Sequence, residues 1–286
     1  MAQASAAIGL TQSVERALSL LTCFDDAHPR LRVGDLARRL QLSQSTVSRL
    51  LATMESLGFV ERDTQTGLYG LGLELVTLAG VALNQLEVRR QAVAELAAVA
   101  ADLGLAANLA ILRNDELFYL ATVEGPKAPK LFTMIGKRAP LHATGMGKAL
   151  LAHLPSAERD AILARLSYPR FTRFTAANAE DLWPMLESAR TRGYASEREE
   201  LAFGRACLAA VIRDASGAVL GATSISGPLS ALDLDNREQQ LAARVIEMAD
   251  TISHRLGLVT IPASAVMGWP HDDKALQPTS ATDAAI

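Results

Sequence analysis

Residues 42–71 read LSQSTVSRLLATMESLGFVERDTQTGLYGL, and this stretch decides how the N-terminal part of the chain folds. Ser43 is a good helix N-cap, and Gly58 is a helix stop signal. Between them runs an apolar stripe at helical spacing: Val47, Leu50, Leu51, Met54 and Leu57. FVERD and LYGL then have the composition of short strands joined by the TQTG turn. The stretch therefore predicts a helix followed by an antiparallel hairpin.

Two more helices are expected before this one. Apolar residues at helical spacing after Thr11 predict the first: Val14, Leu18, Leu21 and Phe24. The segment VGDLARRLQ predicts the second, through the apolar face Val33, Leu36, Ala37 and Leu40. Three helices and a hairpin form a winged helix-turn-helix, which we assign to residues 11–71. Residues 1–10 have small side chains and are expected to form a flexible N-terminus.

The face of the third helix opposite its apolar stripe displays Gln44, Ser45, Ser48 and Arg49, which donate to phosphates and base edges. Between His28 and Leu50 there are five arginines and one acid, although the whole chain has a net charge of −3. A helical bundle with a solvated polar face is the alternative, but the hairpin and the basic bias favour DNA binding. The expected DNA-binding residues are Arg38, Ser43, Gln44, Ser45, Thr46, Ser48, Arg49, Arg62 and Thr64.

A linker helix is expected at residues 72–84, because residues 71–104 are good helix formers without proline. Its apolar stripe comprises Leu75, Leu78, Ala79 and Leu83. A small domain can hardly bury this stripe unaided, so a partner chain is expected to cover it. Packing against the chain's own second domain is the alternative.

Residues 85–261 mix strands and helices without strict alternation, which indicates an α+β domain. NLAILRNDELFYLATVEG predicts two strands around an Asn-Asp turn, and KLFTMIG, residues 130–136, predicts a third. ACLAAVIRDASGAVLGATSISG predicts another strand pair, and a final helix is expected after a capping box of Asp235 and Glu238. Residues 262–286 contain three prolines and little periodicity, so a disordered tail is expected there.

The composition, 49% hydrophobic and 21% charged, is typical of a globular protein. Cys23 and Cys207 lie far apart and form no metal-ligand spacing, so we expect no disulfide framework, no metal and no cofactor, and a reducing cytoplasm is the natural compartment. The sequence shows no secretory leader and no run of about 18 apolar residues, so a membrane association is not expected.

The segment HATGMGKALL differs from a nucleotide-binding loop, because His142 stands where that loop needs glycine and Ala149 where it needs serine or threonine. A loop that opens a helix at residues 145–147 still exposes backbone N–H groups that favour an anion, and a close-packed helix start is the alternative. Ser224 and Ser226 share one sheet face, which is either wet surface or the floor of a polar pocket.

Two further residue groups have competing interpretations. Cys207 leads an apolar strand and is expected to be a packing residue, with a catalytic nucleophile as the alternative. No partner base is identifiable from its spacing, so no catalytic residue is assigned. Arg198 and Glu200 are expected in a solvated loop.

Six segments in order resemble the IclR family of bacterial transcriptional regulators: VERALSLLTCF, STVSRLLATMESLGFVERD, LYGLG, PLHATGMGKALLA, RGYASEREELAFGRACLAA and SISGP. The resemblance covers about residues 11–257. It implies a dimerising linker helix and a C-terminal effector-binding domain with a GAF-like α/β fold. It also implies homodimers, often paired into tetramers, that bind double-stranded operator DNA, commonly as repressors, and respond to small carboxylic acids.

The resemblance places the effector pocket on Gly145, Met146, Glu197, Cys207, Ser224 and Ser226. Glu197 stands where the family often has aspartate, so a pocket of altered size or polarity is expected. We therefore predict a transcriptional regulator and no enzyme. The alternative is a small-molecule enzyme with Cys207 or Ser226 as nucleophile and an appended DNA-binding domain.

Overall fold

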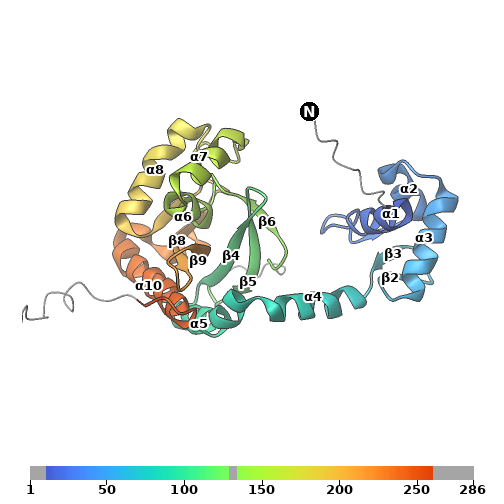
Figure 1. Cartoon of the computed structure of the whole chain (residues 1–286), viewed down its shortest axis with the longest axis horizontal. Helices are drawn as coiled ribbons and strands as arrows, with labels where there is room; N and C mark the ends of the chain where they lie inside the picture. The colour runs from blue at the N-terminus through green and yellow to red at the C-terminus, as the bar shows by residue number, and fades with distance from the viewer. Residues whose placement is uncertain (1–10, 129–133, 260–286) are drawn as a thin grey trace, which may run out of the picture. The chain divides into compact units, whose positions relative to one another are not determined.

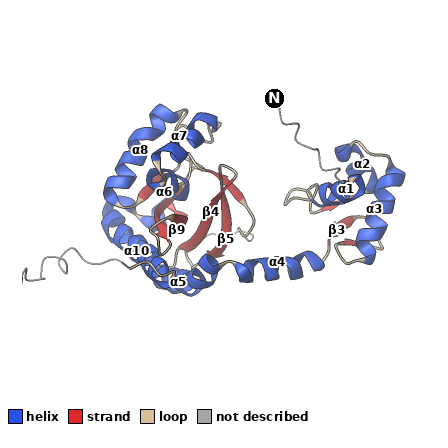
Figure 2. Ribbon diagram, viewed as in Figure 1, coloured by secondary structure: helices blue, strands red, loops and turns tan. Residues whose placement is uncertain are grey.

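The computed structural model describes residues 11–128 and 134–259. The chain divides between Leu86 and Glu87 into two compact units, which are considered separately (Figures 1 and 2). The flexible N-terminus expected at 1–10 and the disordered tail expected at 262–286 lie outside the described residues.

The N-terminal unit contains three helices and a small antiparallel sheet (Figure 1). The helices are α1 (Gln12–Leu21), α2 (Val33–Leu40) and α3 (Gln44–Ser56). The strands are β1 (Arg30–Leu31), β2 (Val60–Arg62) and β3 (Tyr69–Leu71), in the order β1-β3-β2. Leu20, Leu36, Val47 and Leu51 are fully buried in its core. The predicted winged helix-turn-helix is confirmed, with β1 as an addition that is too short to give a sequence pattern.

Three apolar residues expected to face this core are exposed instead. Val14, Leu18 and Leu57 are 55%, 60% and 60% exposed. The core of this unit is small, and α1 uses a different side for it, where Leu20 is buried with Ala17 and Leu21 packed beside it. The expectation of inward packing was therefore wrong for these three side chains.

Helix α4 (Glu74–Gln85) follows β3 and buries none of its residues. Leu73, just before it, is 73% exposed, and Val76, Leu78 and Val81 are 66%, 48% and 59% exposed. The helix therefore presents an apolar surface to its surroundings in the single chain.

The C-terminal unit is a six-stranded antiparallel sheet in the order β6-β5-β4-β9-β8-β7. Its strands are β4 (Ala106–Arg113), β5 (Glu116–Val123), β6 (Arg138–Pro140), β7 (Ala195–Arg198), β8 (Arg205–Arg213) and β9 (Val219–Pro228). Helices α5 (Glu87–Leu103) and α10 (Leu234–Arg255) pack on the sheet, and α6 (Gly145–His153) packs across its other face (Figure 2). Helices α7 (Ser156–Arg165) and α8 (Ala179–Arg192) extend that second core, and α9 (Leu229–Leu232) is one short turn. The α+β prediction is confirmed.

Two local expectations in this unit need correction. The third strand is β6 at 138–140, whereas residues 130–133 of the expected segment lie outside the described residues. Helix α10 begins at Leu234, so Asp235 is not its N-cap. The reason is Asp233, whose positive φ of 49° reverses the chain after α9 and starts the helix two residues earlier than expected.

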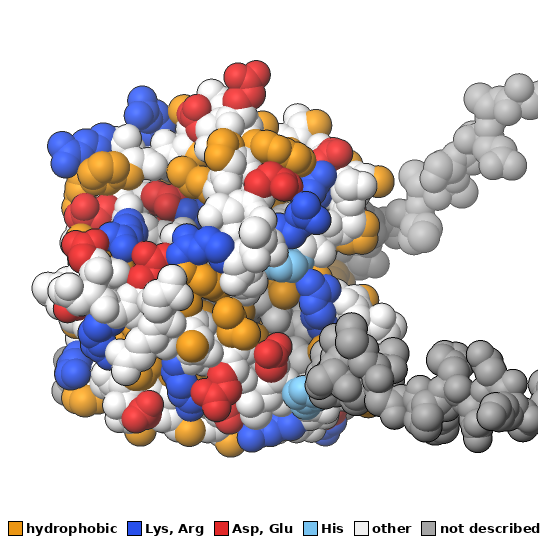
Figure 3. Space-filling model, turned by 90° about the vertical axis from the view of Figure 1, so that its left-hand side faces the viewer, with side chains coloured by type: hydrophobic (Ala, Val, Ile, Leu, Met, Phe, Trp, Pro, Cys, Tyr) orange, Lys and Arg blue, Asp and Glu red, His pale blue; other side chains and the backbone are white. Residues whose placement is uncertain are grey.

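Asp235 and Glu238 form ion pairs instead of a capping box. Arg198 contacts Asp235 at 2.7 Å and Glu238 at 3.0 Å, and Arg192 also pairs with Glu238. Figure 3 shows basic and acidic side chains interspersed over the face that it displays.

Three further observations concern metal, membrane and thiol chemistry. Within residues 11–128 and 134–259, no group of three His, Cys, Asp or Glu residues could hold a metal ion. None of the helices in the same ranges is both long and apolar enough to cross a bilayer. Both cysteines are free thiols, Cys207 buried and Cys23 partly exposed.

Candidate functional site

The start of α3 divides the predicted DNA-binding residues into two groups. Ser43 caps the helix by accepting the N–H of Thr46 at 3.2 Å, and its hydroxyl contacts those of Ser45 at 3.0 Å and Thr46 at 2.8 Å. Gln44, Ser48 and Arg49 are exposed, and no described residue hydrogen-bonds to their side chains. The first group fixes the helix start, while the second has its donors free for a ligand.

The remaining predicted contacts lie beside α3 and on the hairpin. Arg38 is an exposed residue of α2, Arg62 lies on β2, and Thr64 is in the turn after it. Asp63 orders that turn by accepting the backbone N–H groups of Gln65 at 2.9 Å and Thr66 at 3.0 Å, which holds the pKa of its carboxyl below the usual value. No sequence pattern indicated that Arg30 supports this turn, where its guanidinium pairs with Asp63 at 3.0 Å.

The C-terminal unit contains a cavity of about 70 Å³ between the sheet and the start of α6. Five of the six residues expected at the effector pocket line it: Met146, Glu197, Cys207, Ser224 and Ser226. Gly145 lies directly behind Cys207, since a Cβ there would be 2.5 Å from the thiol sulfur. The structure thus brings the predicted residues together. Four polar lining residues were missed: Asn108, Tyr119, Thr144 and Arg205.

Strand register explains why residues far apart in sequence meet in this cavity. Glu197 on β7 is opposite Cys207 on β8, and Cys207 is opposite Ser226 on β9. Ser224, two residues earlier on β9, is opposite Asn108 on β4. Directly paired residues share a sheet face, so four neighbouring strands place these side chains on one surface.

Asn108 organises the floor of the cavity. Its side-chain amide donates to Ser224 Oγ at 3.1 Å and Ser226 Oγ at 3.0 Å, and its Oδ1 accepts from Thr122 at 3.0 Å. Because each serine oxygen already accepts a hydrogen bond, the serine O–H groups can donate to a ligand. The available signal for Asn108 was a single amide within the apolar strand AANLAIL.

The start of α6 offers fewer free donors than the sequence suggested. Thr144 accepts the N–H of Gly147 at 3.2 Å and donates to Pro140 O at 2.8 Å. The N–H of Gly145 hydrogen-bonds to Cys207. A Cβ on Gly147 would lie 2.2 Å from the Leu141 carbonyl oxygen, so this glycine permits close packing. Both glycines therefore fit the alternative interpretation of this segment, a close-packed helix start, better than an anion site.

Among the described residues, no hydrogen bond joins either side chain considered as a nucleophile to a base, and Glu197, opposite Cys207, accepts backbone N–H groups instead. Burial raises the pKa of the Cys207 thiol to about 12, although the Gly145 N–H acts in the opposite direction. A thiol of that pKa is protonated at neutral pH and is a poor nucleophile. The recorded side-chain partner of Ser226 is the Asn108 amide, which cannot act as a base.

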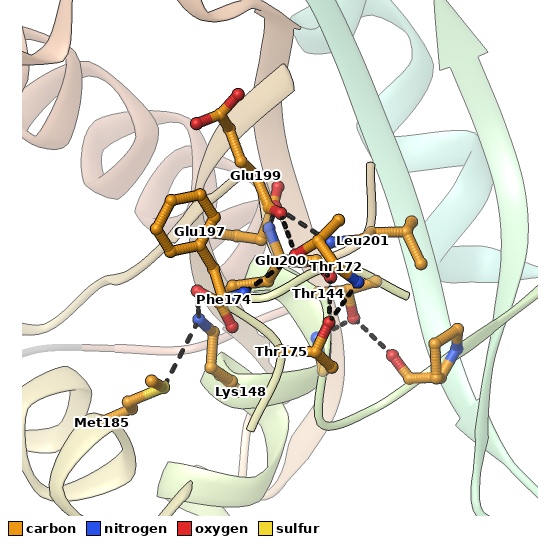
Figure 4. A network of polar contacts seen from close by, with 12 residues as sticks. Thr144, Lys148, Thr172, Phe174, Thr175, Met185, Glu197, Glu199, Glu200 and Leu201 are labelled. Atoms are coloured by element: carbon orange, nitrogen blue, oxygen red, sulfur yellow. Dashed lines mark hydrogen bonds and ion pairs between the residues drawn. The ribbon is translucent and has the colours of Figure 1, made fainter. Parts of the chain in front are cut away.

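A buried polar network holds one wall of the cavity (Figure 4). Glu197 Oε1 accepts the backbone N–H groups of Glu200 at 2.7 Å and Leu201 at 3.3 Å, and burial raises its pKa to about 7. Lys148 pairs with Glu200. The hydroxyls of Thr172 and Thr175 each donate to backbone carbonyls of this segment at 2.6 Å.

The solvated position expected for Glu200 is therefore wrong, since this side chain is only 6% exposed. A positive neighbour for it was not visible in the sequence, because Lys148 lies 52 residues away along the chain. Arg198 remains partly exposed and turns to Asp235 and Glu238, so it does not line the cavity.

Two family models match the sequence. The model described as the IclR helix-turn-helix domain matches residues 13–64, and the bacterial transcriptional regulator IclR C-terminal model matches residues 80–254. The HTH-type transcriptional regulator XynR of Escherichia coli is 34% identical over 81% of this chain and 93% of its own length. The HTH-type transcriptional repressor AllR of Klebsiella pneumoniae is 32% identical over 86% and 90%.

One solved structure of this kind contains a small acid. It is an IclR homolog from Microbacterium hydrocarbonoxydans complexed with 4-hydroxybenzoate, with a TM-score of 0.74 and 26% identity. The match covers 85% of this chain and 98% of that one. The similarity therefore extends over both units.

Proposed function

The chain belongs to the IclR family of bacterial transcriptional regulators, and from this premise we propose that it represses transcription as a homodimer under the control of a small carboxylic acid. As a family member it is a DNA-binding transcriptional regulator with an effector-binding C-terminal domain. The observation that carries the acid proposal is the cavity floor, where two serine hydroxyls have protons free to donate.

DNA binding is assigned to the exposed face of α3 together with the hairpin. Gln44, Ser48 and Arg49 reach base edges or phosphates, and Arg62 and Thr64 contact the backbone beside them. Ser43, Ser45 and Thr46 contribute by fixing the first turn of α3, where their hydroxyls contact one another. Two such units in a symmetric dimer read two half-sites about one DNA turn apart.

Dimerisation is assigned to α4, because Val76, Leu78 and Val81 are exposed within the described chain, although Leu75 and Leu83 of the expected stripe are partly buried. Leu78 and Val81 are 48% and 59% exposed, which is unusual for large aliphatic side chains along one helix. A second copy of the helix buries this surface, and further pairing of dimers gives a tetramer.

The direction of regulation and the class of effector draw support from similar proteins. AllR is named a repressor, and the Microbacterium homolog binds 4-hydroxybenzoate. An acid controls transcription here only if it binds the DNA-competent and DNA-free states with different affinities. The enzyme alternative loses support, because no hydrogen bond joins Cys207 or Ser226 to a base among the described residues, the Cys207 thiol has a raised pKa, and the relatives are named as regulators.

The test combines operator selection with ligand screening on the full chain. A two-fold DNA sequence should be selected from a random library, and small carboxylic acids, beginning with 4-hydroxybenzoate, should change both its affinity and the thermal midpoint of the protein. An acid at 100 times its Kd stabilises the domain by about 2.7 kcal/mol. Selection of no preferred sequence overturns DNA recognition, and acids without effect on either measurement overturn the proposed effector class.

A further inference from the structure

We propose that Arg205 is the cationic partner of the effector's carboxylate, and that a second oxygen of the effector reaches the hydroxyls of Ser224 and Ser226. This inference rests on the proposed function, because it assigns the charged contact within the same cavity. It defines the ligand class as small acids with a hydroxyl, keto or second carboxyl group.

The strand geometry places Arg205 at one end of a polar line. Arg205 is the first residue of β8 and lies two residues before Cys207, so both are on the cavity face of the strand. Its cross-strand neighbour is Pro228, at the end of β9, while Cys207 is opposite Ser226. The serines therefore lie further along the sheet than Arg205, and a ligand with two oxygen functions can span them.

The guanidinium of Arg205 forms no ion pair within the described protein, since Glu197, the acid in the same cavity, accepts the backbone N–H groups of Glu200 and Leu201 instead. Two other arginines of the same sheet are occupied, since Arg198 pairs with Asp235 and Arg213 donates to Gly217 O at 2.9 Å, whereas Arg113 is exposed and lies outside the cavity lining. No ion pair or side-chain hydrogen bond joins Arg205 to another described residue, although its carbonyl accepts the N–H of Glu199 at 2.8 Å. The backbone is thus fixed while all the guanidinium donors remain available.

The surroundings of Arg205 suit an anion. It is the cationic member of the described lining residues, and Lys148 is committed to Glu200 outside this cavity. Tyr119 lines the same cavity, and the positive charge of Arg205 partly opposes the increase in its pKa that burial causes. The N–H groups of Gly145 and Gly147 are already bonded, so these two backbone donors cannot supply the anion contact.

The expected contact is a bidentate pair between guanidinium and carboxylate, with the opposite end of the ligand on the serines. A cavity of about 70 Å³ limits the ligand to a small acid. A neutral amide of the same shape keeps the serine contacts but loses the charge pairing. Discrimination between an acid and its amide therefore reports on Arg205 specifically.

The experiment uses the full chain and calorimetry with a panel of short aliphatic, hydroxy, keto and aromatic carboxylic acids, including 4-hydroxybenzoate. Each acid that binds is compared with its primary amide on wild type, Arg205→Gln, Arg205→Lys and Arg113→Gln. Arg113 is the matched control, since it is an exposed arginine on β4 outside the cavity lining.

We expect wild type and Arg113→Gln to prefer the acid over its amide by at least about tenfold, Arg205→Gln to lose that preference, and Arg205→Lys to retain part of it. Thermal midpoints without ligand should agree among the four proteins, which separates a binding role from a folding role. An acid that binds wild type and Arg205→Gln equally overturns this inference but leaves the proposed function standing. Failure of every acid to bind wild type overturns the proposed effector class and the inference together.

Discussion

The buried ammonium of Lys148 forms an ion pair with the carboxylate of Glu200 and thereby ties α6 to the segment that follows β7. Lys148 is 1% exposed and Glu200 is 6% exposed, so water cannot replace either partner. Leu201 and Ala202, directly after Glu200, line the cavity. The pair therefore positions one wall of the effector site without contacting the cavity itself.

Removal of one member of this pair should be strongly destabilising. Lys148→Met leaves an uncompensated buried carboxylate and should lower the free energy of unfolding by about 3–5 kcal/mol, whereas Lys148→Met/Glu200→Gln should recover a large part of the loss. Urea denaturation measures both. The control is Arg190→Met, whose pair with Glu187 is 61% and 42% exposed and should contribute less than about 1 kcal/mol. If the double variant lost as much free energy of unfolding as Lys148→Met and Glu200→Gln lose together, Lys148 and Glu200 would not stabilise the fold as a pair.

Arg49 tests the assignment of α3 to DNA. Arg49→Ala should weaken operator binding by roughly 5- to 150-fold, with the loss concentrated at one base position of each half-site if the side chain reads a base. If it contacts phosphate, affinity for random DNA should fall as well and the salt dependence should decrease. Fluorescence anisotropy on both DNA types distinguishes these cases, with Arg113→Ala as the charge-matched control. Unchanged binding to both would remove Arg49 from the interface.

Leu78 tests the assembly through α4. Leu78→Glu should shift the sedimentation coefficient at micromolar concentration from dimer toward monomer, because a charge would enter the buried helix surface. Thr191→Glu is the matched control, since Thr191 is an exposed residue of another helix, α8. A wild-type chain that sediments as a monomer and still binds the operator tightly would overturn dimerisation.

Local pattern was sufficient for most of the fold, and the residues at which it failed share a physical reason. Helical spacing and turn residues identify the winged unit and the Asn114–Asp115 turn, whose φ angles of 52° and 60° are those that asparagine and aspartate tolerate best. Val14 and Leu18 satisfy the same spacing and yet are exposed, because periodicity does not specify how large a core the neighbouring elements provide.

The cavity was predictable only where a family motif marked it. Five motif residues line it. Asn108 lies outside the six segments that carry the resemblance, and Arg205 lies within one of them without an assigned role. Both join the cavity through strand register, which depends on pairings between distant segments. The prediction of a solvated Glu200 was wrong for a related reason, since the burial of this side chain depends on Lys148, which meets it only in the folded chain.

Ser226 tests the floor of the cavity. Ser226→Ala removes a hydroxyl donor and should weaken binding of a responsive acid by about 1–3 kcal/mol, while operator affinity without the acid stays near wild type. Asn108→Ala should give a similar loss indirectly, because it releases both serine hydroxyls from their fixed orientation. Calorimetry and anisotropy measure the two effects, and Ser216→Ala, in the exposed turn before β9, is the control. Normal acid binding by both Ser224→Ala and Ser226→Ala would place the ligand elsewhere.

Glu197 should make effector binding depend on pH. Burial raises its pKa to about 7, so the side chain is largely protonated at pH 6 and largely ionised at pH 8. An ionised Glu197 repels a bound carboxylate, and the ligand in turn raises the pKa of Glu197 further, so binding takes up protons. Affinity for a responsive acid should therefore fall as pH rises from 6 to 8, and Glu197→Gln should remove most of this dependence. Calorimetry in buffers of different ionisation enthalpy measures both the affinity and the proton uptake. An affinity independent of pH in wild type, or equally pH-dependent in Glu197→Gln, would show that Glu197 does not face the ligand's charge.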